Sequence, residues 1–135
     1  MPVSKCILDY FEDKFGYEEA HNLKWHILPH LANNSRFTLV NTSHNIGSKI
    51  LGIFVRVLKK HWQQKYGDEL KWILTYVGAG KDGTVYKAAG WQYLGMTKGF
   101  HRVGPVYRND LMSKASARRC EDVTSYPKKV FIKAV

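Results

Sequence analysis

The sequence contains little cysteine and no long apolar run. Cys6 and Cys120 are the two thiols among 135 residues, and neither has a second cysteine at the spacing of a zinc motif. We therefore expect neither a disulfide framework nor a structural metal, and isolated thiols fit a reducing cytoplasm. No apolar stretch approaches the roughly 18 residues of a membrane span, and the first residues lack a signal-peptide pattern. Membrane and secreted proteins are disfavoured.

Acidic residues are also scarce. The 11 Asp and Glu side chains are outnumbered by 21 Lys and Arg side chains, which gives a formal net charge of +10. The excess is greatest in residues 81–135, where eleven side chains are basic and four are acidic. This balance favours a polyanionic partner, above all nucleic acid, but an anionic cofactor or a need for solubility would fit it too.

No internal repeat, low-complexity tract or linker divides the sequence, and its length is that of one domain, so we predict a single domain over residues 1–135. Apolar periodicity predicts a helix over residues 4–14 and a long helix from residue 46 to about residue 65, ending at Gly67. The apolar residues that we expect on one face of the long helix are Ile46, Ile50, Ile53, Phe54, Val57, Leu58 and Trp62.

Short apolar runs predict the strands. We expect a turn at residues 33–35, a short helix at residues 85–89, and strands at residues 36–40, 70–77, 91–96 and 129–135. The strand at 36–40 should lie inside the sheet, and residues 99–127 show no pattern that predicts an element. Strands separated by helices indicate an α/β or α+β fold with at least one parallel pair.

The segment from Thr42 to Ser48 links the expected strand at 36–40 to the long helix. The first turn of a helix leaves backbone N–H groups unpaired, and the helix dipole favours anions there. Small residues such as Ser43 and Gly47 would let a phosphate group approach the backbone. An ordinary N-cap, with a glycine where the helix packs closely on the sheet, explains the same residues.

A longer pattern lies downstream. After the strand at residues 73–77 and a glycine-rich turn, residues 83–97 read GTVYKAAGWQYLGMT. This pattern resembles the C-terminal half of the GNAT acyltransferase superfamily. More narrowly, it is similar to the Mom-type DNA modification proteins of phages and to the Druantia-A-like, transposase-associated family. Further stretches that resemble these families in the same order are NNSRF (33–37), NIGSKIL (45–51), Trp62, Tyr66-Gly67 and PKKVFI (127–132).

The resemblance implies a GNAT-like mixed central sheet flanked by helices, with acetyl-CoA as cofactor. For a Mom-like activity it implies modification of the exocyclic amine of adenine in DNA, in a bacterial cytoplasm if a phage or mobile element encodes the protein. Only about 35 residues precede the expected strand at 36–40, so the N-terminal half is abbreviated relative to the usual fold. A second chain, as in a homodimer, is one way to complete the acceptor side of the site.

The resemblance also implies catalytic roles for Tyr86, Ser48 and Tyr76. Tyr86 would donate a proton to the leaving thiolate, although a packed tyrosine with a structural hydrogen bond is the alternative. Tyr76 and Thr75 would lie where two central strands part and the thioester enters, and Thr75 or Ser48 would hydrogen-bond the acyl group. The residues expected to bind the cofactor are Thr42, Ser43, His44, Asn45, Ile46, Gly47, Ser48, Lys49 and Tyr86.

The loop departs from the family pattern. GNAT proteins usually read Arg/Gln-x-x-Gly-x-Gly/Ala, and this chain has Thr42-x-x-Asn45-x-Gly47, which retains only the last glycine. The departure leaves a non-catalytic protein as an alternative. His44 is a candidate general base or a side chain of the cap region. His21, His26 and His30 cluster in sequence, but Pro29 interrupts the helix that would align them, so we expect no metal site.

Basic and aromatic residues alternate in the C-terminal half. Cationic side chains would neutralise phosphates while aromatic rings stack on bases, and a solvated basic loop is the alternative. The residues expected to contact nucleic acid are Arg36, Trp91, Lys98, Arg102, Arg108, Arg118 and Arg119. DNA is thus the expected partner.

Three functions follow, in order of preference. The first is an acyl-CoA-dependent transferase of the GNAT fold acting on nucleic acid, which would flip its target base out of a duplex. The second is a non-catalytic GNAT-like module that binds DNA or a partner from a defence system. The third is an N-acetyltransferase acting on a protein lysine or a small amine, which the basic surface disfavours.

Overall fold

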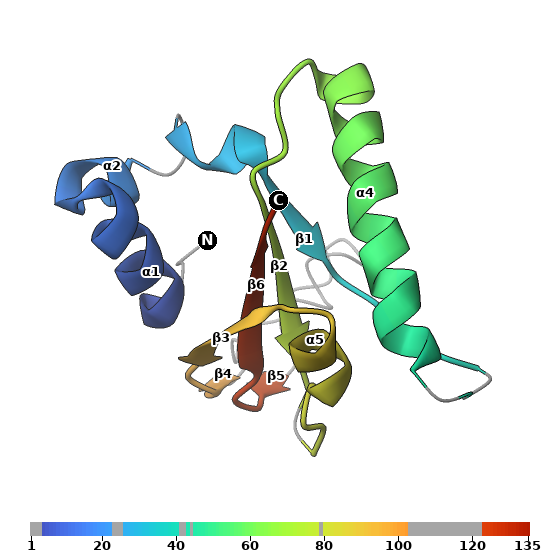
Figure 1. Cartoon of the computed structure of the whole chain (residues 1–135). Helices are drawn as coiled ribbons and strands as arrows, with labels where there is room; N and C mark the ends of the chain where they lie inside the picture. Colours follow the sequence, from blue (N-terminus) through green and yellow to red (C-terminus); the bar gives the residue numbers. More distant parts are fainter. Residues whose placement is uncertain (1–3, 23–25, 41–42, 44, 79, 103–122) are drawn as a thin grey trace, which may run out of the picture.

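The computed structural model describes residues 4–22, 26–40, 43, 45–78, 80–102 and 123–135 (Figure 1). Its centre is a four-stranded mixed sheet in the order β1-β2-β6-β3. β1 (Leu31–Asn34) and β2 (Trp72–Val77) are parallel, whereas β6 (Lys129–Ala134) runs antiparallel to β2 and to β3 (Gln92–Met96). The predicted mixed α and β class, with a parallel pair, is confirmed.

One face of the sheet is covered by α1 (Lys5–Phe15) and α2 (Tyr17–His21). Ile7 and Phe11 are buried and lie four residues apart, on the same face of α1. Phe11 packs edge-on against Trp72 of β2, with ring centroids 5.1 Å apart. The helix predicted over residues 4–14 is thus confirmed, and its apolar stripe holds it on the sheet.

The other face is covered by α4 (Ile46–Tyr66) and α5 (Thr84–Ala88) (Figure 1). α4 connects the parallel strands β1 and β2. It ends as predicted, because Gly67 takes a left-handed conformation with φ of 75° and its N–H donates to the carbonyl of Gln63.

The buried face of α4 differs from the predicted one. Gly47, Leu51 and Val55 are buried, and Leu58 and Trp62 pack partly against the core. Four apolar residues expected on the same face are instead between 36% and 56% exposed: Ile50, Ile53, Phe54 and Val57. Both sets recur at helical spacing, so periodicity alone does not choose between them. The buried set contains Gly47, whose lack of a side chain lets α4 approach α5 closely.

β1 lies earlier in the chain than predicted. Leu31 packs against the core on the α1 side of the sheet and Ala32 against the core on the α4 side, so this segment buries both its faces. The predicted strand at residues 36–40 and the turn at 33–35 are therefore wrong, and Val40 is 99% exposed. β1 also lies at the edge of the four-stranded sheet and not inside it.

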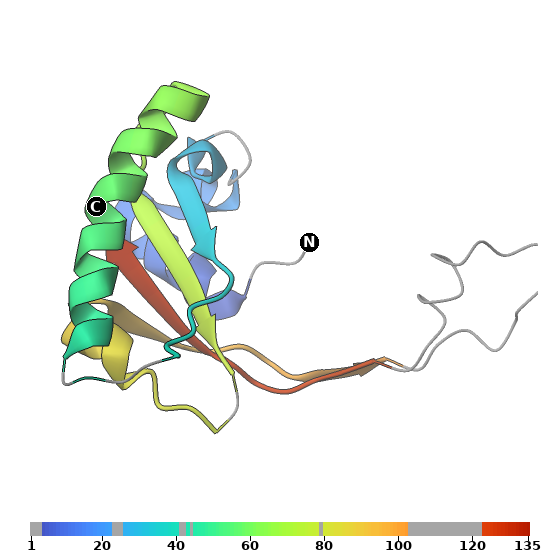
Figure 2. The ribbon, with the colours of Figure 1, turned by 90° about the vertical axis from the view of Figure 1, so that its right-hand side faces the viewer.

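The remaining elements agree with prediction to within two residues at each end: the strands expected at 70–77, 91–96 and 129–135 are β2, β3 and β6, and the helix at 85–89 is α5. Residues 99–127, where the sequence predicts no element, contain β4 (Phe100–Arg102) and β5 (Val123–Ser125). These two strands pair antiparallel in a separate two-stranded sheet. Figure 2 shows them as a ribbon that leaves the body of the protein. Within the described ranges, no helix has the length and apolar character needed to cross a membrane.

Candidate functional site

A buried tyrosine hydroxyl lies where the pairing of β1 and β2 ends. Tyr86, on α5, is only 7% exposed. Its hydroxyl oxygen accepts a hydrogen bond from the side-chain amide of Asn34 at 3.3 Å and lies 3.4 Å from the hydroxyl oxygen of Thr75. Asn34, the last residue of β1, pairs with Thr75 of β2. We call Asn34, Thr75 and Tyr86 the polar triad.

Thr75 orients the hydrogen bonds of the polar triad. It is buried, and its hydroxyl lies 3.1 Å from the main-chain carbonyl oxygen of Asn34. A threonine hydroxyl donates one hydrogen bond and accepts up to two. When Thr75 donates to the carbonyl, which is nearer than Tyr86, its own oxygen can only accept. The Tyr86 proton is then directed either to Thr75 or to a molecule bound beside it.

Aromatic packing and one glycine fix the position of Tyr86. Gly83, just before α5, has φ of 70°, and a Cβ there would lie 2.6 Å from the ring of Phe131, so only glycine fits. The Tyr86 ring stacks on Phe131 with centroids 5.8 Å apart and meets Trp91 edge-on at 5.2 Å. The ring is held on both sides while the hydroxyl reaches the sheet.

The two parallel strands separate at the polar triad. Their pairing runs from Leu31 and Trp72 to Asn34 and Thr75, whereas β2 stays paired with β6 as far as Val77. Beyond β1 the chain turns across the site, and the ring centroid of Phe37 lies 6.2 Å from that of Tyr86. The polar triad therefore lies at the point of divergence, where the resemblance places the entering thioester.

The first turn of α4 packs tightly against α5. Gly47 is buried, and a Cβ at this position would lie 2.5 Å from the Val85 side chain and 2.9 Å from that of Leu39. The space beside Gly47 is therefore filled by apolar side chains. The small size of this residue serves helix packing, which is the second of the two interpretations open from the sequence.

The exposed part of this turn comprises Ser43, Asn45 and Lys49. Asn45 is the N-cap residue, with a left-handed φ of 61°, and its side chain makes no capping hydrogen bond. The Ser48 hydroxyl donates to the Asn45 carbonyl at 3.1 Å, so it is engaged within its own turn. Ile46 is half-buried, and Thr42 and His44 lie outside the described residues.

Tyr76 does not join the polar triad. Successive residues of a strand point to opposite faces of a sheet, so Tyr76 lies on the α1 side while Thr75 lies on the α5 side. Tyr76 is 39% exposed. Burial raises the pKa of its hydroxyl, with a further contribution from the nearby Cys6 thiolate. The structure thus separates the two tyrosines that the sequence groups together.

Trp91 is a core residue. It is 4% exposed and packs against Tyr86, so it has no free ring face on which a base could stack. Its buried indole N–H has no acceptor within the described part of the chain. We therefore remove Trp91 from the residues expected to contact nucleic acid.

The other residues expected to contact nucleic acid are spread over the chain. Arg36 is exposed shortly after β1, Lys98 is exposed shortly after β3, and Arg102 lies in β4. Arg108, Arg118 and Arg119 lie outside the described residues.

The clustered histidines have separate surroundings. The His30 Nδ1 atom lies 2.7 Å from the carbonyl oxygen of Glu69, to which it donates a hydrogen bond that ties the start of β1 to the start of β2. The His21 ring packs on Tyr17, with centroids 4.1 Å apart, and His26 is exposed. Over the residues that the structure describes, no group of three potential ligands could hold a metal ion.

Sequence reasoning missed Asn34. The sequence predicts a turn at residues 33–35, yet Asn34 ends a strand and its side chain donates to Tyr86. One signal was available: polar residues at the carboxyl ends of parallel strands often form binding sites. The sequence predicts the strand at residues 36–40, however, so Asn34 precedes the predicted strand and does not lie at its carboxyl end.

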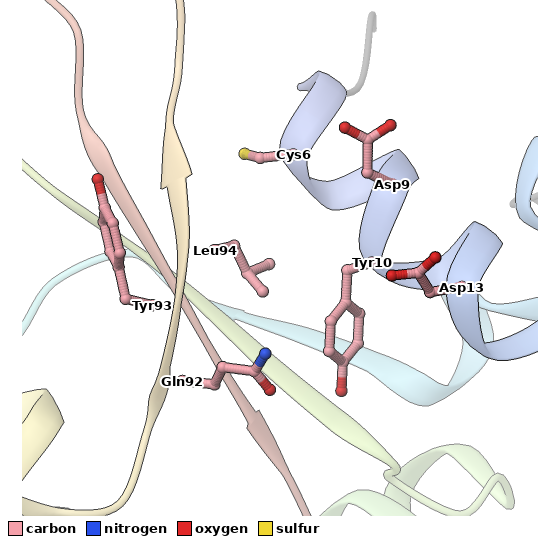
Figure 3. Close-up of a pocket in the computed structure, with 7 residues that line it drawn as sticks. All are labelled: Cys6, Asp9, Tyr10, Asp13, Gln92, Tyr93 and Leu94. Atoms are coloured by element: carbon pink, nitrogen blue, oxygen red, sulfur yellow. The ribbon is translucent and has the colours of Figure 1, made fainter.

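A pocket of about 230 Å³ lies between α1 and β3 (Figure 3). Its lining residues are Cys6, Asp9, Tyr10, Asp13, Gln92, Tyr93 and Leu94. Burial raises the pKa of the Cys6 thiol. The sheet lies between this pocket and the polar triad, because α1 and α5 cover opposite faces. We therefore do not include the pocket in the candidate site.

Sequence comparison identifies the family. The family model described as the Mom protein family matches residues 20–127, a range that includes all three residues of the polar triad. The chain belongs to the Mom protein family. No curated protein and no solved structure matches the chain.

Membership in the Mom family confirms the Mom-type part of the resemblance. The match starts at residue 20, so α1 and the helical side of the pocket lie outside it, whereas α4, α5 and the polar triad lie inside. The wider GNAT relationship and the likeness to the Druantia-A-like family are not tested by this comparison and stay predictions.

Proposed function

We propose that this Mom-family protein is an acyl-CoA-dependent transferase that modifies a base amine in DNA, with adenine as the expected base. Family membership over residues 20–127 supports a role in phage DNA modification. The observation that carries the chemical part is the polar triad, which holds the Tyr86 hydroxyl beside the diverging strands. The net charge of +10 supports a polyanionic substrate.

The start of α4 offers groups that fit acyl-CoA. The exposed residues Ser43, Asn45 and Lys49 lie at the N-terminal end of a 21-residue helix, where the dipole and the Lys49 ammonium favour phosphate. The same turn packs on α5, which carries Tyr86. When bound, acyl-CoA supplies an acyl group activated as a thioester. Ser43, Asn45 and Lys49 would hold its phosphates.

The polar triad would handle the proton that the reaction requires. Acyl transfer to an amine forms a C–N bond and breaks a C–S bond, and the departing sulfur gains a proton while the nitrogen loses one to water. With acyl-CoA bound, Tyr86 would donate its hydroxyl proton to the departing sulfur. The Asn34 amide, which already donates to the Tyr86 oxygen, would stabilise the phenolate that remains. Tyr86 would then regain a proton from solvent.

The test is acyl transfer to duplex DNA, measured by mass spectrometry of the digested nucleosides after incubation with acetyl-CoA. Tyr86→Phe keeps the ring that stacks on Phe131 and removes the hydroxyl. We expect it to lower turnover by about a hundredfold or more while DNA binding is unchanged. Tyr93→Phe is the matched control, because Tyr93 also contacts Phe131 but is 45% exposed. Equal turnover in Tyr86→Phe and the wild type contradicts the proton-donor role.

A non-catalytic DNA-binding module is the second candidate, and the filled space beside Gly47 favours it. Titration calorimetry with acetyl-CoA separates the two candidates. Saturable binding that weakens in Lys49→Gln supports the transferase. If acetyl-CoA does not bind while duplex DNA does, the non-catalytic module is supported instead.

A further inference from the structure

The ribbon formed by residues 97–102 and 123–128 stands apart from the rest of the protein. β4 and β5 pair with each other in a sheet of their own, and Figure 2 shows them extending away from the four-stranded sheet. An isolated two-stranded ribbon buries little apolar surface and is marginally stable in water. The rest of the chain therefore stabilises the ribbon little, and a bound partner would bury surface that the ribbon leaves uncovered.

The base of the ribbon is well defined. The N–H of Thr97 donates to the carbonyl of Lys128 at 2.8 Å, and the N–H of Lys128 donates to the Thr97 hydroxyl at 2.9 Å. Pro127 has no N–H to offer, and the Thr97 hydroxyl joins the two strands at this point. Lys98, between β3 and β4, and Lys128, between β5 and β6, are both exposed, and so is Tyr126, at 67%.

The charge of the ribbon has one sign. No Asp or Glu occurs in residues 97–102 or 123–128, whereas Lys98 and Lys128 carry ammonium groups. Lys129, the first residue of β6, lies outside the ribbon, 3.9 Å from Asp82. Lys98 and Lys128 are exposed at the base of the ribbon, one in each of its two segments, and neither pairs with a carboxylate among the described residues. This arrangement fits a polyanion better than it fits a protein surface.

The width of the ribbon favours duplex DNA as the polyanion. Paired strands lie about 4.8 Å apart, so a two-stranded ribbon with its side chains fits the major groove of B-DNA, which is about 12 Å wide. Lys98 and Lys128, at the base of the ribbon, would then face the phosphates on the two sides of the groove.

The ribbon also begins beside the candidate site. Lys129 pairs with Val77 at the end of β2, and Thr75 of the polar triad pairs with Phe131, two residues further along β6. Two residues of a strand span about 7 Å. The base of the ribbon thus lies at the same end of the central strands as the Tyr86 hydroxyl, and DNA bound at that base would reach the site.

We propose that the ribbon of residues 97–102 and 123–128 inserts into the major groove of duplex DNA and places the duplex beside the polar triad. This inference rests on the proposed function, because it identifies how the same site receives its DNA substrate.

The experiment measures the binding of a fluorescent 20-base-pair duplex by anisotropy at several salt concentrations. The ribbon variant is Lys98→Gln with Lys128→Gln, and the matched control is Lys14→Gln with Lys65→Gln, which removes two exposed lysines elsewhere. We expect the ribbon variant to bind at least about tenfold more weakly at 0.1 M salt and its log–log salt slope to fall by about 2, since each phosphate contact contributes about 0.9. The control should bind like the wild type.

Competition identifies the groove. Methyl green, which occupies the major groove, should displace the wild-type protein, and netropsin, which occupies the minor groove, should not. Displacement by netropsin alone overturns the inference, and so does equal binding by the ribbon variant and the wild type. Binding of polyglutamate is measured in the same way, as a probe for an acidic protein partner. If the ribbon variant loses polyglutamate binding but keeps duplex binding, the inference is overturned in favour of such a partner.

The outcomes for the two proposals are separable. If the wild type binds no duplex at any salt concentration, both the ribbon inference and the DNA substrate are wrong. If the wild type and the ribbon variant bind equally well, only the ribbon inference is wrong. Ribbon-dependent binding without any acyl transfer contradicts the proposed reaction alone.

Discussion

The side-chain amide of Asn34 donates a hydrogen bond to the hydroxyl oxygen of Tyr86, which is 52 positions away in the sequence. The two residues come from an edge strand and a five-residue helix. They meet because Asn34 pairs with Thr75, whose hydroxyl oxygen lies 3.4 Å from that of Tyr86. Asn34 contacts Tyr86 and not a reacting atom. We therefore assign it a positioning role.

Replacement of Asn34 by Ala should reduce turnover without weakening DNA binding. The variant loses the donor that fixes the Tyr86 hydroxyl and stabilises its phenolate, and a single hydrogen bond to a charged group contributes about 1.5–3 kcal/mol. We expect kcat for acyl transfer to fall by roughly tenfold to a hundredfold, while KM for acyl-CoA changes little. The measurement is steady-state kinetics on duplex DNA.

Asn33→Ala is the control, because Asn33 is the preceding residue of β1 and its side chain is exposed. It should leave kcat unchanged. A rise in KM with constant kcat in Asn34→Ala would contradict the positioning role and would place Asn34 in substrate binding.

Two glycines of α4 should respond in opposite ways to replacement by Ala. A Cβ at Gly47 would lie within 3 Å of Val85 and Leu39, whereas a Cβ at Gly52 meets nothing within 4 Å. Gly47→Ala should therefore destabilise the protein by about 1–3 kcal/mol through overpacking. Gly52→Ala should stabilise it by about 0.5–1 kcal/mol, because Ala is the better helix former. Denaturant unfolding measures both changes.

Equal effects of the two substitutions would show that α4 does not pack on α5 through Gly47. The expected result also guides the choice of variants for cofactor binding. Loss of acyl-CoA binding in a Gly47 variant would reflect a displaced helix, so Lys49, which is exposed, is the better position for that test.

The sequence was sufficient to locate most elements but not to orient them. Apolar residues at helical spacing placed α4 almost to the residue, since Gly67 ends it in a left-handed turn. The prediction of which face of α4 is buried is wrong, because the helix has two apolar stripes. The close contact of Gly47 with Val85 determines which stripe faces the core. Only the tertiary structure contains that contact.

The candidate site was predicted in part for a similar reason. The pattern around Tyr86 is local and was recognised, whereas Asn34 becomes part of the site only through the parallel pairing with Thr75. The grouping of Tyr76 with Tyr86 ignored the alternation of side chains along β2. The ribbon was missed because its strands are three residues long and 20 residues separate them.

The phase of α4 can be tested by comparing Leu51→Ala with Ile53→Ala. Leu51 is fully buried, so its truncation should lower the free energy of unfolding by about 2–5 kcal/mol. Ile53 is 56% exposed, and its truncation should change that free energy by no more than about 0.5 kcal/mol. Urea unfolding of the two variants provides the comparison. The reverse order would support the face predicted from periodicity.

The Cys6 thiol should ionise at higher pH in the folded protein than in the unfolded chain. Burial is the main cause of its raised pKa, and the charge of Asp9 adds to it. Only the thiolate reacts with iodoacetamide. Cys120 is replaced by Ser so that only Cys6 reacts. At pH 8 the folded protein should then react more slowly than the same protein in urea. Its reaction rate should also continue to rise with pH after the rate of the unfolded chain has reached its plateau.

The raised pKa of Cys6 makes the stability of the protein depend on pH. Between the pKa values of the folded and unfolded states, the folded state retains the Cys6 proton and the unfolded state has lost it, so the native state binds more protons. The free energy of unfolding must then decrease as the pH rises through the pKa of the unfolded thiol. Cys6→Ser, which does not titrate there, should remove this contribution when unfolding is followed from pH 7 to pH 10. Tyr76 begins to ionise near the top of this range in the unfolded chain only, because burial raises its pKa in the folded protein. It therefore contributes a decrease of the same sign, which persists in Cys6→Ser. An identical pH dependence in both proteins would show that the Cys6 thiol is as well solvated in the folded state as in the unfolded chain.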